Sequence, residues 1–200
     1  MVFIINENKK YIELDKNDIT SLYNRLSKKF DKLDINGNIN SQELKFDDGK
    51  YIGQVVNGKA EGIGIFYCHD GDRYEGEWKN DKNEGKGIYY FNDGDTYEGE
   101  WRNGHKEGKG IYYFNDGNRY EGDWKNDKKE GRGIYYYNHG ICKGDRYEGN
   151  WRNGKKDGKG IYYFNDGERY EGDYKNNKAE GKGIFYYNNG DRMMGDLMPR

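Results

Sequence analysis

The sequence predicts an all-β array of repeated β-hairpins that follows a small α+β segment at the N-terminus. The first observation behind this prediction is a unit that recurs at a step of 23 residues (97 − 74), with one step of 27 (147 − 120). The tyrosine that opens each unit is Tyr51, Tyr74, Tyr97, Tyr120, Tyr147 and Tyr170, and Met193 stands in the same place at the end. The second observation is that residue types alternate inside the unit. A fixed period of this size indicates a repeat array in which each unit needs its neighbours.

Each unit contains two stretches that alternate as β-strands do. In the first, Tyr97, Gly99 and Trp101 fall on one face of an extended chain and the glutamates between them on the other. The second stretch, residues 108–114, alternates in the same way. About seven polar residues between the two predict a connecting loop, and the Asn-Asp-Gly before each new unit predicts a turn. One repeat is therefore predicted to be one β-hairpin.

The glycines and aromatic residues predict how such a hairpin is stabilised. The chain is 16% aromatic but only 32% hydrophobic, and leucine is absent between Leu44 and Leu197. Glycine is a poor strand residue, yet it recurs here at fixed offsets beside tyrosine and tryptophan. A glycine leaves room for a neighbouring ring to lie flat over the backbone. We therefore expect interlocked rings and glycines to form the core, each ring contributing roughly 1.5–3 kcal/mol.

The spacing Tyr-x-Gly-x-Trp followed by Gly-x-Gly resembles the MORN repeat family (membrane occupation and recognition nexus) over about three quarters of the chain. The residues that carry the resemblance are Tyr74, Gly76, Trp78, Gly85, Gly87, Tyr89, Tyr97, Gly99, Trp101, Gly108, Gly110, Tyr112, Tyr120, Gly122, Trp124, Gly131, Gly133, Tyr135, Tyr147, Gly149, Trp151, Gly158, Gly160 and Tyr162, with Tyr170 and Gly172 in the last unit. The resemblance implies an elongated, single-layered antiparallel sheet of stacked hairpins, with six repeats and a C-terminal half repeat in residues 46–200. It also implies a binding or assembly module without catalysis of its own.

Residues 1–45 differ in kind from the repeats. Two short apolar stretches, residues 2–5 and 11–14, predict a small hairpin. Apolar residues then recur at helical spacing and predict a helix over Lys16–Lys32. They are Ile19, Leu22, Leu26, Phe30 and Leu33. One interpretation is that this helix caps the open edge of the first hairpin, and the alternative is that it docks a partner.

After this helix comes a stretch that is similar to part of an EF-hand calcium loop. The candidate ligands are Asp34, Asn36, Asn38, Asn40 and Glu43, around a glycine at the position where the loop turns. A lysine stands at the first ligand position, and starting the loop at Asp34 instead leaves it two residues short. A polar turn is therefore the favoured interpretation, and we expect neither a metal site nor a cofactor.

Charge and cysteine content narrow the classes of function. The 34 basic and 36 acidic residues give a net charge of −2, which provides no general attraction for nucleic acid. Cys68 and Cys142 occupy non-equivalent positions, which fits a reducing compartment, and neither lies at zinc spacing from its neighbouring histidine. The carboxylates recur in every unit as on a solvated surface. We therefore expect that the protein is not an enzyme. We also expect it to be cytoplasmic, because the apolar run in residues 1–6 is too short for a signal peptide.

The leading functional hypothesis is a scaffold that assembles proteins, at a membrane or on the cytoskeleton. Its candidate partner face is a ladder of tyrosines, namely Tyr90, Tyr113, Tyr136, Tyr163 and Tyr186. Its candidate self-association edge, which would give a homodimer, is the apolar C-terminal stretch of Met193, Met194, Leu197 and Met198. Four additional residues at 141–144 lengthen one turn, as accidental variation or as a contact point.

Two other hypotheses compete with the scaffold. The first is binding of acidic phospholipids, such as phosphoinositides, through basic residues at equivalent positions: Lys79, Arg102, Lys125, Arg152 and Lys175. The second follows from residues 89–94, which are similar to choline- or glucan-binding repeats, in which aromatic rings surround a cation or a sugar. Such repeats belong to secreted proteins, so this hypothesis ranks last.

Overall fold

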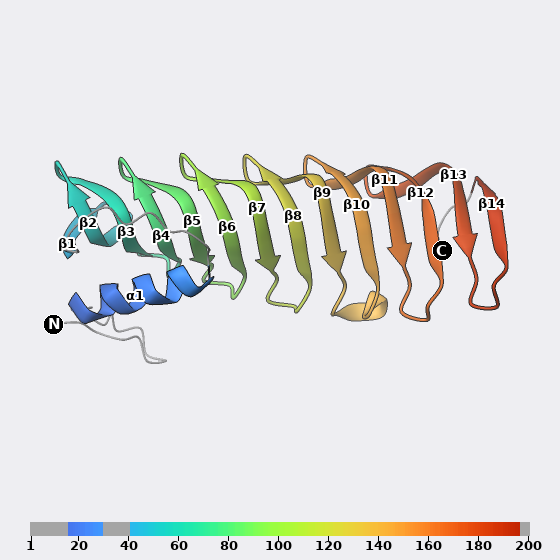
Figure 1. The fold of residues 1–200 in the computed structure, drawn as a ribbon, viewed down its shortest axis with the longest axis horizontal. Coiled ribbons are helices and arrows are strands. Elements are labelled where there is room, and N and C mark those ends of the chain that lie inside the picture. The colour runs from blue at the N-terminus through green and yellow to red at the C-terminus, as the bar shows by residue number, and fades with distance from the viewer. Residues whose placement is uncertain (1–15, 30–40, 197–200) are drawn as a thin grey trace. The chain divides into compact units, whose positions relative to one another are not determined.

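The computed structural model describes residues 16–29 and 41–196, which form one α-helix and one open antiparallel β-sheet (Figure 1). The elements are α1 (Lys16–Lys29), β1 (Ser41–Phe46), β2 (Gly49–Val56), β3 (Lys59–Cys68), β4 (Arg73–Lys79), β5 (Lys82–Tyr90), β6 (Thr96–Arg102), β7 (His105–Tyr113), β8 (Arg119–Lys125), β9 (Lys128–Tyr136), the 3₁₀ turn η1 (Gly140–Cys142), β10 (Arg146–Arg152), β11 (Lys155–Tyr163), β12 (Arg169–Lys175), β13 (Lys178–Tyr186) and β14 (Arg192–Asp196). The fourteen strands follow one another in chain order, which confirms the predicted all-β array of stacked hairpins.

The chain divides into two compact units, which are described separately. The N-terminal unit comprises Met1–Asn92 with Glu100–Gly104, and the C-terminal unit comprises Asp93–Gly99 with His105–Arg200. The predicted division between residues 45 and 46 falls inside β1, and it stays a prediction. The predicted hairpin of residues 2–14 lies outside the described residues.

Inside each hairpin the connection is shorter than the sequence suggested. Between β10 and β11 it consists of Asn153 and Gly154, whose φ angles are 49° and 82°. Two consecutive residues with positive φ make the tight turn that matches strand twist, and asparagine followed by glycine is well suited to it. The predicted loop of about seven residues is therefore wrong: its later residues belong to β11, and the register shift between Gly149 and Trp151 accommodates them as a β-bulge.

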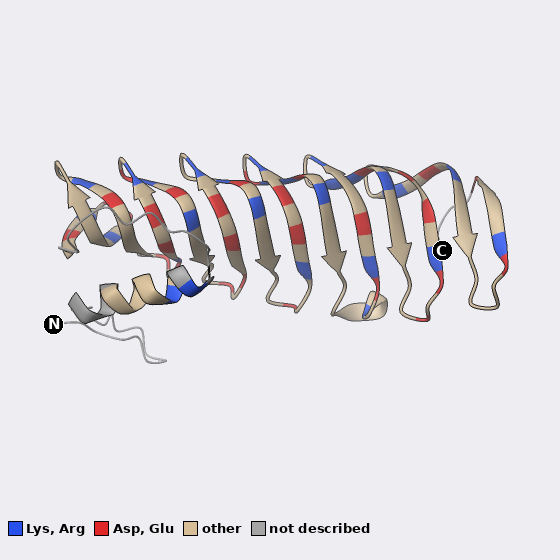
Figure 2. Ribbon diagram, in the orientation of Figure 1, with Lys and Arg blue, Asp and Glu red and all other residues tan. Residues whose placement is uncertain are grey.

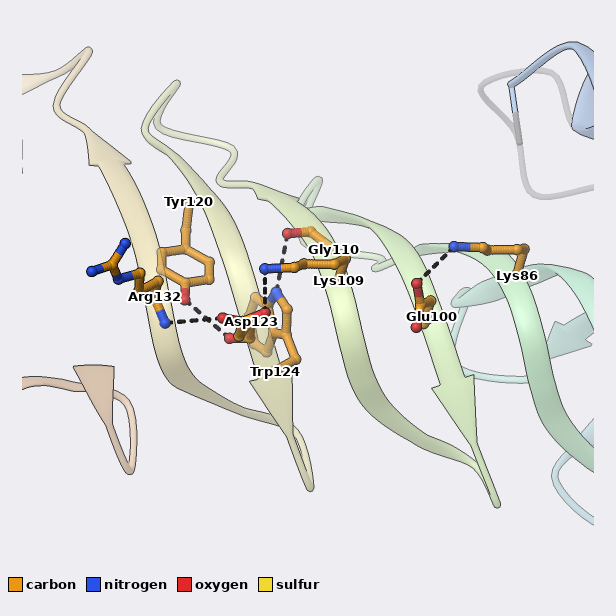
Figure 3. Close-up of polar contacts among 8 residues, drawn as sticks. All are labelled: Lys86, Glu100, Lys109, Gly110, Tyr120, Asp123, Trp124 and Arg132. Carbon is orange, nitrogen blue, oxygen red and sulfur yellow. Dashed lines mark hydrogen bonds and ion pairs between the residues drawn. The ribbon is translucent and has the colours of Figure 1, made fainter. Parts of the chain in front are cut away.

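The core of each hairpin is a tyrosine that lies flat over two paired glycines. In the hairpin β8–β9, a Cβ atom on Gly133 would lie 2.4–2.6 Å from ring and hydroxyl atoms of Tyr120, and Gly122 pairs with Gly133 directly beneath this ring. The Tyr120 hydroxyl donates a hydrogen bond of 3.0 Å to the carbonyl oxygen of Asp123 (Figure 3). The ring is fully buried. The expected packing of rings over glycine backbone is thus present.

Tryptophans join each hairpin to the one before it. Trp124 Nε1 donates a hydrogen bond of 3.2 Å to the carbonyl oxygen of Gly110 (Figure 3), and Trp151 makes the same bond to Gly133. Tyr120 lies between these two indoles, with ring centroids 5.3 and 5.1 Å away in edge-to-face geometry. Edge-to-face contacts of this kind add to the stabilisation from burial. The aromatic core is therefore continuous along the hairpins of each unit.

Helix α1 packs on one face of the N-terminal unit. It matches the predicted helix as far as Lys29, and Phe30 and Leu33 lie outside the described residues. Leu22 and Leu26 are buried in one cluster with isoleucines of β2, β3 and β5: Ile52, Ile63, Ile65 and Ile88. The edge strand of this unit is β1, which pairs with β2 alone. The described contacts of α1 are therefore on the face of the sheet.

Candidate interaction surface

The face of the sheet opposite the tyrosine and glycine core carries three rows of alternating side chains, which we call the ladder face. Antiparallel pairing places residues of neighbouring strands side by side, so a pattern that repeats every two strands becomes a straight row across the sheet. In the C-terminal unit the rows contain tyrosine with arginine, isoleucine with glutamate, and lysine or arginine with aspartate or asparagine. Figure 2 shows the basic and acidic positions as bands along these strands.

The first row stacks arginine on tyrosine in successive hairpins. The guanidinium carbon of Arg119 lies 4.2 Å from the ring centroid of Tyr136, its cross-strand partner. The same geometry recurs at 4.2 Å for Arg146 on Tyr163 and at 3.8 Å for Arg169 on Tyr186. A guanidinium over a ring at this distance makes a cation–π contact. These contacts order long side chains on a face of the sheet that solvent reaches.

The second row places each glutamate between two isoleucines. Glu121 pairs across the ladder with Ile111 on one side and Ile134 on the other. An arginine two residues earlier on the same strand lies beside Glu121, Glu148 and Glu171, at 3.6 Å for Arg119 and Glu121. The equivalent ion pairs are Arg146 with Glu148 at 3.8 Å and Arg169 with Glu171 at 3.0 Å. We call this arrangement, a glutamate with flanking isoleucines and an adjacent arginine, the glutamate site of a hairpin.

The third row consists of ion pairs between neighbouring strands. Lys109 Nζ lies 2.5 Å from Asp123 Oδ1 (Figure 3), and Lys159 Nζ lies 2.7 Å from Asp173 Oδ2. Both lysines are more than 70% exposed, so these pairs contribute little to stability. Basic and acidic groups thus alternate across the strands in this row, while in the other two rows the arginine and the glutamate of one strand lie side by side, as Arg119 and Glu121 do.

In the N-terminal unit the same face has a glutamate site that is closed. Glu75 pairs across the ladder with Ile65 and Ile88. Arg73 lies 3.1 Å from its carboxylate, and a second arginine, Arg25 of α1, bonds the other carboxylate oxygen. Glu75 is 2% exposed, although glutamate is rarely buried unless it is paired. Helix α1 therefore closes this site with both apolar and charged contacts.

The predicted partner tyrosines all lie on the ladder face. Four of the five are stacked under an arginine of the preceding strand, as Tyr90 is under Arg73 at 4.3 Å. For Tyr113 the equivalent position is Thr96, which has no guanidinium. The sequence located these tyrosines but missed the arginines. The Arg-Tyr-Glu-Gly that opens most repeats could have revealed them, because residues at positions 1 and 3 of a strand share a face.

Lysines on the opposite face insert among the aromatic rings, which sequence reasoning also missed. Lys129 Nζ lies 4.6–5.0 Å from the centroids of four rings, those of Phe114, Tyr120, Tyr135 and Trp151. Burial lowers the pKa of Lys129 to about 8, and burial likewise lowers that of Lys156 to about 8. The aromatic surroundings that suggested a choline- or glucan-type site thus hold the chain's own ammonium groups at these positions.

Within the residues that the structure describes, the remaining candidate residues do not come together into a site. Met193 and Met194 are 46% and 70% exposed on β14, which pairs with β13 alone, while Leu197 and Met198 lie outside the described residues. Asp34, Asn36, Asn38 and Asn40 also lie outside them, and Glu43 belongs to β1, where Lys50 Nζ is 3.8 Å from its carboxylate. Within residues 16–29 and 41–196, no group of three or more potential ligand side chains could hold a metal ion.

A chain of tandem hairpins with a shared aromatic core defines a class of repeat modules. The MORN repeat model matches residues 51–73, 74–96, 97–119, 120–141, 147–169 and 170–192, so the chain belongs to the MORN repeat family. MORN repeats are non-enzymatic modules that generally mediate protein and membrane interactions. None of the helices in the described part of the chain has the length and apolar character needed to span a membrane.

Comparison with solved structures gives a weaker likeness. The TCP domain of SAS-4 from Drosophila melanogaster, solved in complex with a proline-rich motif of Ana2, is 13% identical to this chain. The match has a TM-score of 0.45 and covers 84% of this chain and 99% of that one. Among curated proteins, none matches this chain.

Proposed function

We propose that this chain is a non-catalytic scaffold that binds a protein partner through the ladder face of its C-terminal unit. The observation that carries the proposal is the repeated stacking of arginine on tyrosine beside half-buried isoleucines, at the same positions in three hairpins. Tyrosine and arginine are the residues that contribute most often to protein interfaces. Ordering their side chains before binding reduces the entropy lost when a partner docks.

The distribution of charge favours a protein over an anionic membrane as the binding partner. Arginines on this face lie beside glutamates, and exposed lysines lie beside aspartates. A phosphoinositide surface attracts basic groups that are not compensated by nearby acids. The alternative of phospholipid binding rests on the exposed basic residue near the end of each first strand, for example Lys125, and on Arg152 and Lys175. Arg152 has Asp157 at 3.6 Å, which weakens the attraction.

Site-specific photo-crosslinking tests the proposed face directly. A photoreactive phenylalanine replaces Tyr136 or Tyr163 in the full chain, and the matched control carries it at Asn126, in an exposed turn. We expect a protein crosslink from both ladder positions and none from the control. Crosslinks of equal yield from all three positions contradict the proposal. Co-sedimentation with phosphoinositide vesicles, lost when Lys125, Arg152 and Lys175 are changed to glutamine, would favour the lipid alternative.

Self-association through β14 is a separate part of the proposal. Its support is an edge strand with two exposed methionines, because unpaired strand edges readily add another strand. Light scattering on the full chain and on a Met194→Lys variant tests it. A dimer that becomes a monomer in the variant supports the edge contact, and a monomer in both overturns it.

A further inference from the structure

We propose that the partner of the ladder face is an amphipathic helix with two leucines four residues apart and an arginine directly before the second leucine. The inference rests on the proposed function and names the chemistry of the partner. Its basis is that this protein already contains one such complex within its own chain, between α1 and the N-terminal unit. The C-terminal unit repeats part of the receiving side of that complex three times, namely the glutamate, its two isoleucine neighbours and its arginine.

The internal complex defines what a glutamate site accepts. Leu22 and Leu26 are buried at 3% and 0% exposure against isoleucines of the sheet. Arg25 lies on the same side of the helix, because residues three and four apart are neighbours on a helix surface. Its guanidinium bonds the carboxylate of Glu75, which sits between Ile65 and Ile88 in the sheet. A helix that binds this site therefore needs two apolar side chains and one arginine that makes a charge-assisted hydrogen bond to the glutamate.

The C-terminal unit presents the same site without a helix over it. Glu121, Glu148 and Glu171 each have isoleucine as the cross-strand neighbour on both sides. Each has its own arginine two residues earlier, as Glu75 does. The side chains of these glutamates are 49%, 50% and 35% exposed, against 3% for Glu75. Each carboxylate therefore has an arginine on one side and stays partly exposed to solvent, although Glu171 Oε2 also accepts a hydrogen bond of 3.5 Å from the Tyr186 hydroxyl.

The differences between the two units indicate how a helix that binds the C-terminal unit differs from α1. Two of the four isoleucines that receive α1 are charged at the equivalent positions of the C-terminal unit. Lysine or arginine replaces Ile63 (Lys109, Arg132 and Lys159), and glutamate replaces Ile52 (Glu98, Glu121 and Glu148). The apolar strip of the C-terminal unit is therefore narrower and is bordered by charge. A helix that fits it has a narrow leucine stripe with polar and acidic flanks, and it is more soluble than a core helix.

The repeat distance also predicts the spacing of a longer partner helix. Glutamate sites recur every second strand, which corresponds to roughly 9.6 Å at the usual strand separation. Figure 1 shows that the axis of α1 runs across the strands of its unit. A helix that lies in this direction advances about 1.5 Å per residue, so successive sites are reached every six or seven residues. A partner with the leucine and arginine motif repeated at a heptad step engages neighbouring sites.

The experiment uses the chain's own helix as the probe. A fluorescent, helix-stabilised peptide with the sequence of residues 16–29 is titrated with the full-length protein at physiological salt, and anisotropy is measured. The test variant is Glu121→Arg with Glu148→Arg. The matched control is Asp116→Arg with Asp166→Arg, which makes the same change of charge in exposed turns away from the ladder face. A second peptide carries Arg25→Glu.

We expect the test variant to bind the natural peptide at least tenfold more weakly than wild type does, and the control to differ by less than twofold. The Arg25→Glu peptide should bind the test variant at least tenfold more tightly than it binds wild type, because the charges have exchanged places. Circular dichroism verifies that each variant is folded.

Two results overturn the inference. One is a wild-type protein that does not bind the peptide, and the other is binding that is equally strong in wild type and the test variant. Neither result affects crosslinking from Tyr136 and Tyr163, so the helical partner and the proposed face fail independently. A peptide with two motifs seven residues apart should bind at least tenfold more tightly than one with a ten-residue step.

Discussion

The two units of this protein have the same kind of aromatic core and differ in what covers the opposite face of the sheet. In both, a buried tyrosine covers paired glycines, and a tryptophan bonds the carbonyl oxygen of a glycine in the preceding hairpin. On the ladder face, however, Glu75 is buried under α1, whereas Glu121 and Glu148 have side chains that are about half exposed. The comparison shows that identical repeat positions can become interior or surface, depending on one segment outside the repeats.

The largest expected effect comes from truncating the helix that makes this difference. Leu26 is fully buried, so Leu26→Ala should destabilise the N-terminal unit by about 2–5 kcal/mol. The control, Ile134→Ala, removes a half-buried side chain at the uncovered face and should cost less. Hydrogen exchange resolved by strand measures both, with the loss for Leu26→Ala confined to β2–β5. Equal losses in both variants would contradict the role of α1 as a structural cover.

Glu75 and Glu121 occupy the same repeat position, and they test whether burial changes the contribution of a glutamate to the free energy of unfolding. Glu75→Gln removes the charge that Arg25 and Arg73 share, and it should cost about 1.5–3 kcal/mol because the hydrogen bond from Arg25 is charge-assisted. Glu121→Gln alters an exposed pair and should cost less than about 1 kcal/mol. Urea unfolding of both variants gives the comparison. If Glu121→Gln destabilises the protein as much as Glu75→Gln does, the contact with the adjacent arginine, and not the contact with α1, determines the loss of stability.

Glycine substitutions test the other half of the comparison, that the core is the same in both units. Gly87→Ala and Gly133→Ala each place a methyl group within 2.2–2.6 Å of a tyrosine ring and hydroxyl. Each should cost about 1–3 kcal/mol or more through overpacking. Gly195→Ala is the control, since a Cβ there meets no atom within 4 Å. Thermal unfolding should rank Gly195→Ala near wild type, and a large difference between the other two would break the shared-core interpretation.

A smaller effect is expected where the last complete hairpin departs from the core pattern. Tyr174 occupies the tryptophan position, and its buried hydroxyl has no hydrogen-bond partner. Tyr174→Trp should supply an indole N–H to the carbonyl oxygen of Gly160 and stabilise the C-terminal unit by about 1 kcal/mol. Tyr174→Phe removes only the hydroxyl. It therefore measures the stability gained by removing an unsatisfied buried polar group, without the hydrogen bond that the indole would add. Denaturation that is unchanged in the tryptophan variant would contradict the inferred bond.

The last comparison is a pH dependence that distinguishes the units. Burial lowers the pKa of Lys129 and Lys156 to about 8 from 10.5, so above pH 8 the unfolded chain binds more protons than the folded one. Stability should therefore rise between pH 8 and 10, by at most about 1.4 kcal/mol per pH unit for each lysine.

Above pH 10 the sign reverses, because burial raises the pKa of Tyr120 and Tyr147. The folded protein then keeps protons that the unfolded chain releases. Equivalent positions in the N-terminal unit are Ala60 and Asn83, so its hydrogen exchange should lack the rise between pH 8 and 10. Lys129→Met with Lys156→Met should reduce the rise in the C-terminal unit, and Lys106, whose pKa burial also lowers, should account for the remainder.

Local pattern explains which parts of the structure could be predicted. The alternation of Tyr97, Gly99 and Trp101 predicts a strand face because side-chain direction in a strand depends only on position. The loop length failed because asparagine and glycine residues are compatible with both a long loop and a tight turn. The choice is made by the register of the paired strands, as at Asn153 and Gly154. Calcium and C-terminal edge residues outside the described ranges stay predictions.

The sequence by itself determined the period, the hairpin, the pairing of tyrosine with glycine and the face on which the partner tyrosines lie. These features follow from residues close together in the chain and from a repeat that places each unit in the same surroundings. Only the tertiary structure decided that Arg119 stacks on Tyr136, that Lys129 enters an aromatic cluster and that α1 closes the site of Glu75. These contacts join residues from different strands or from outside the repeats, and their energy depends on burial. Burial is a property of the assembled sheet, so no single repeat encodes it.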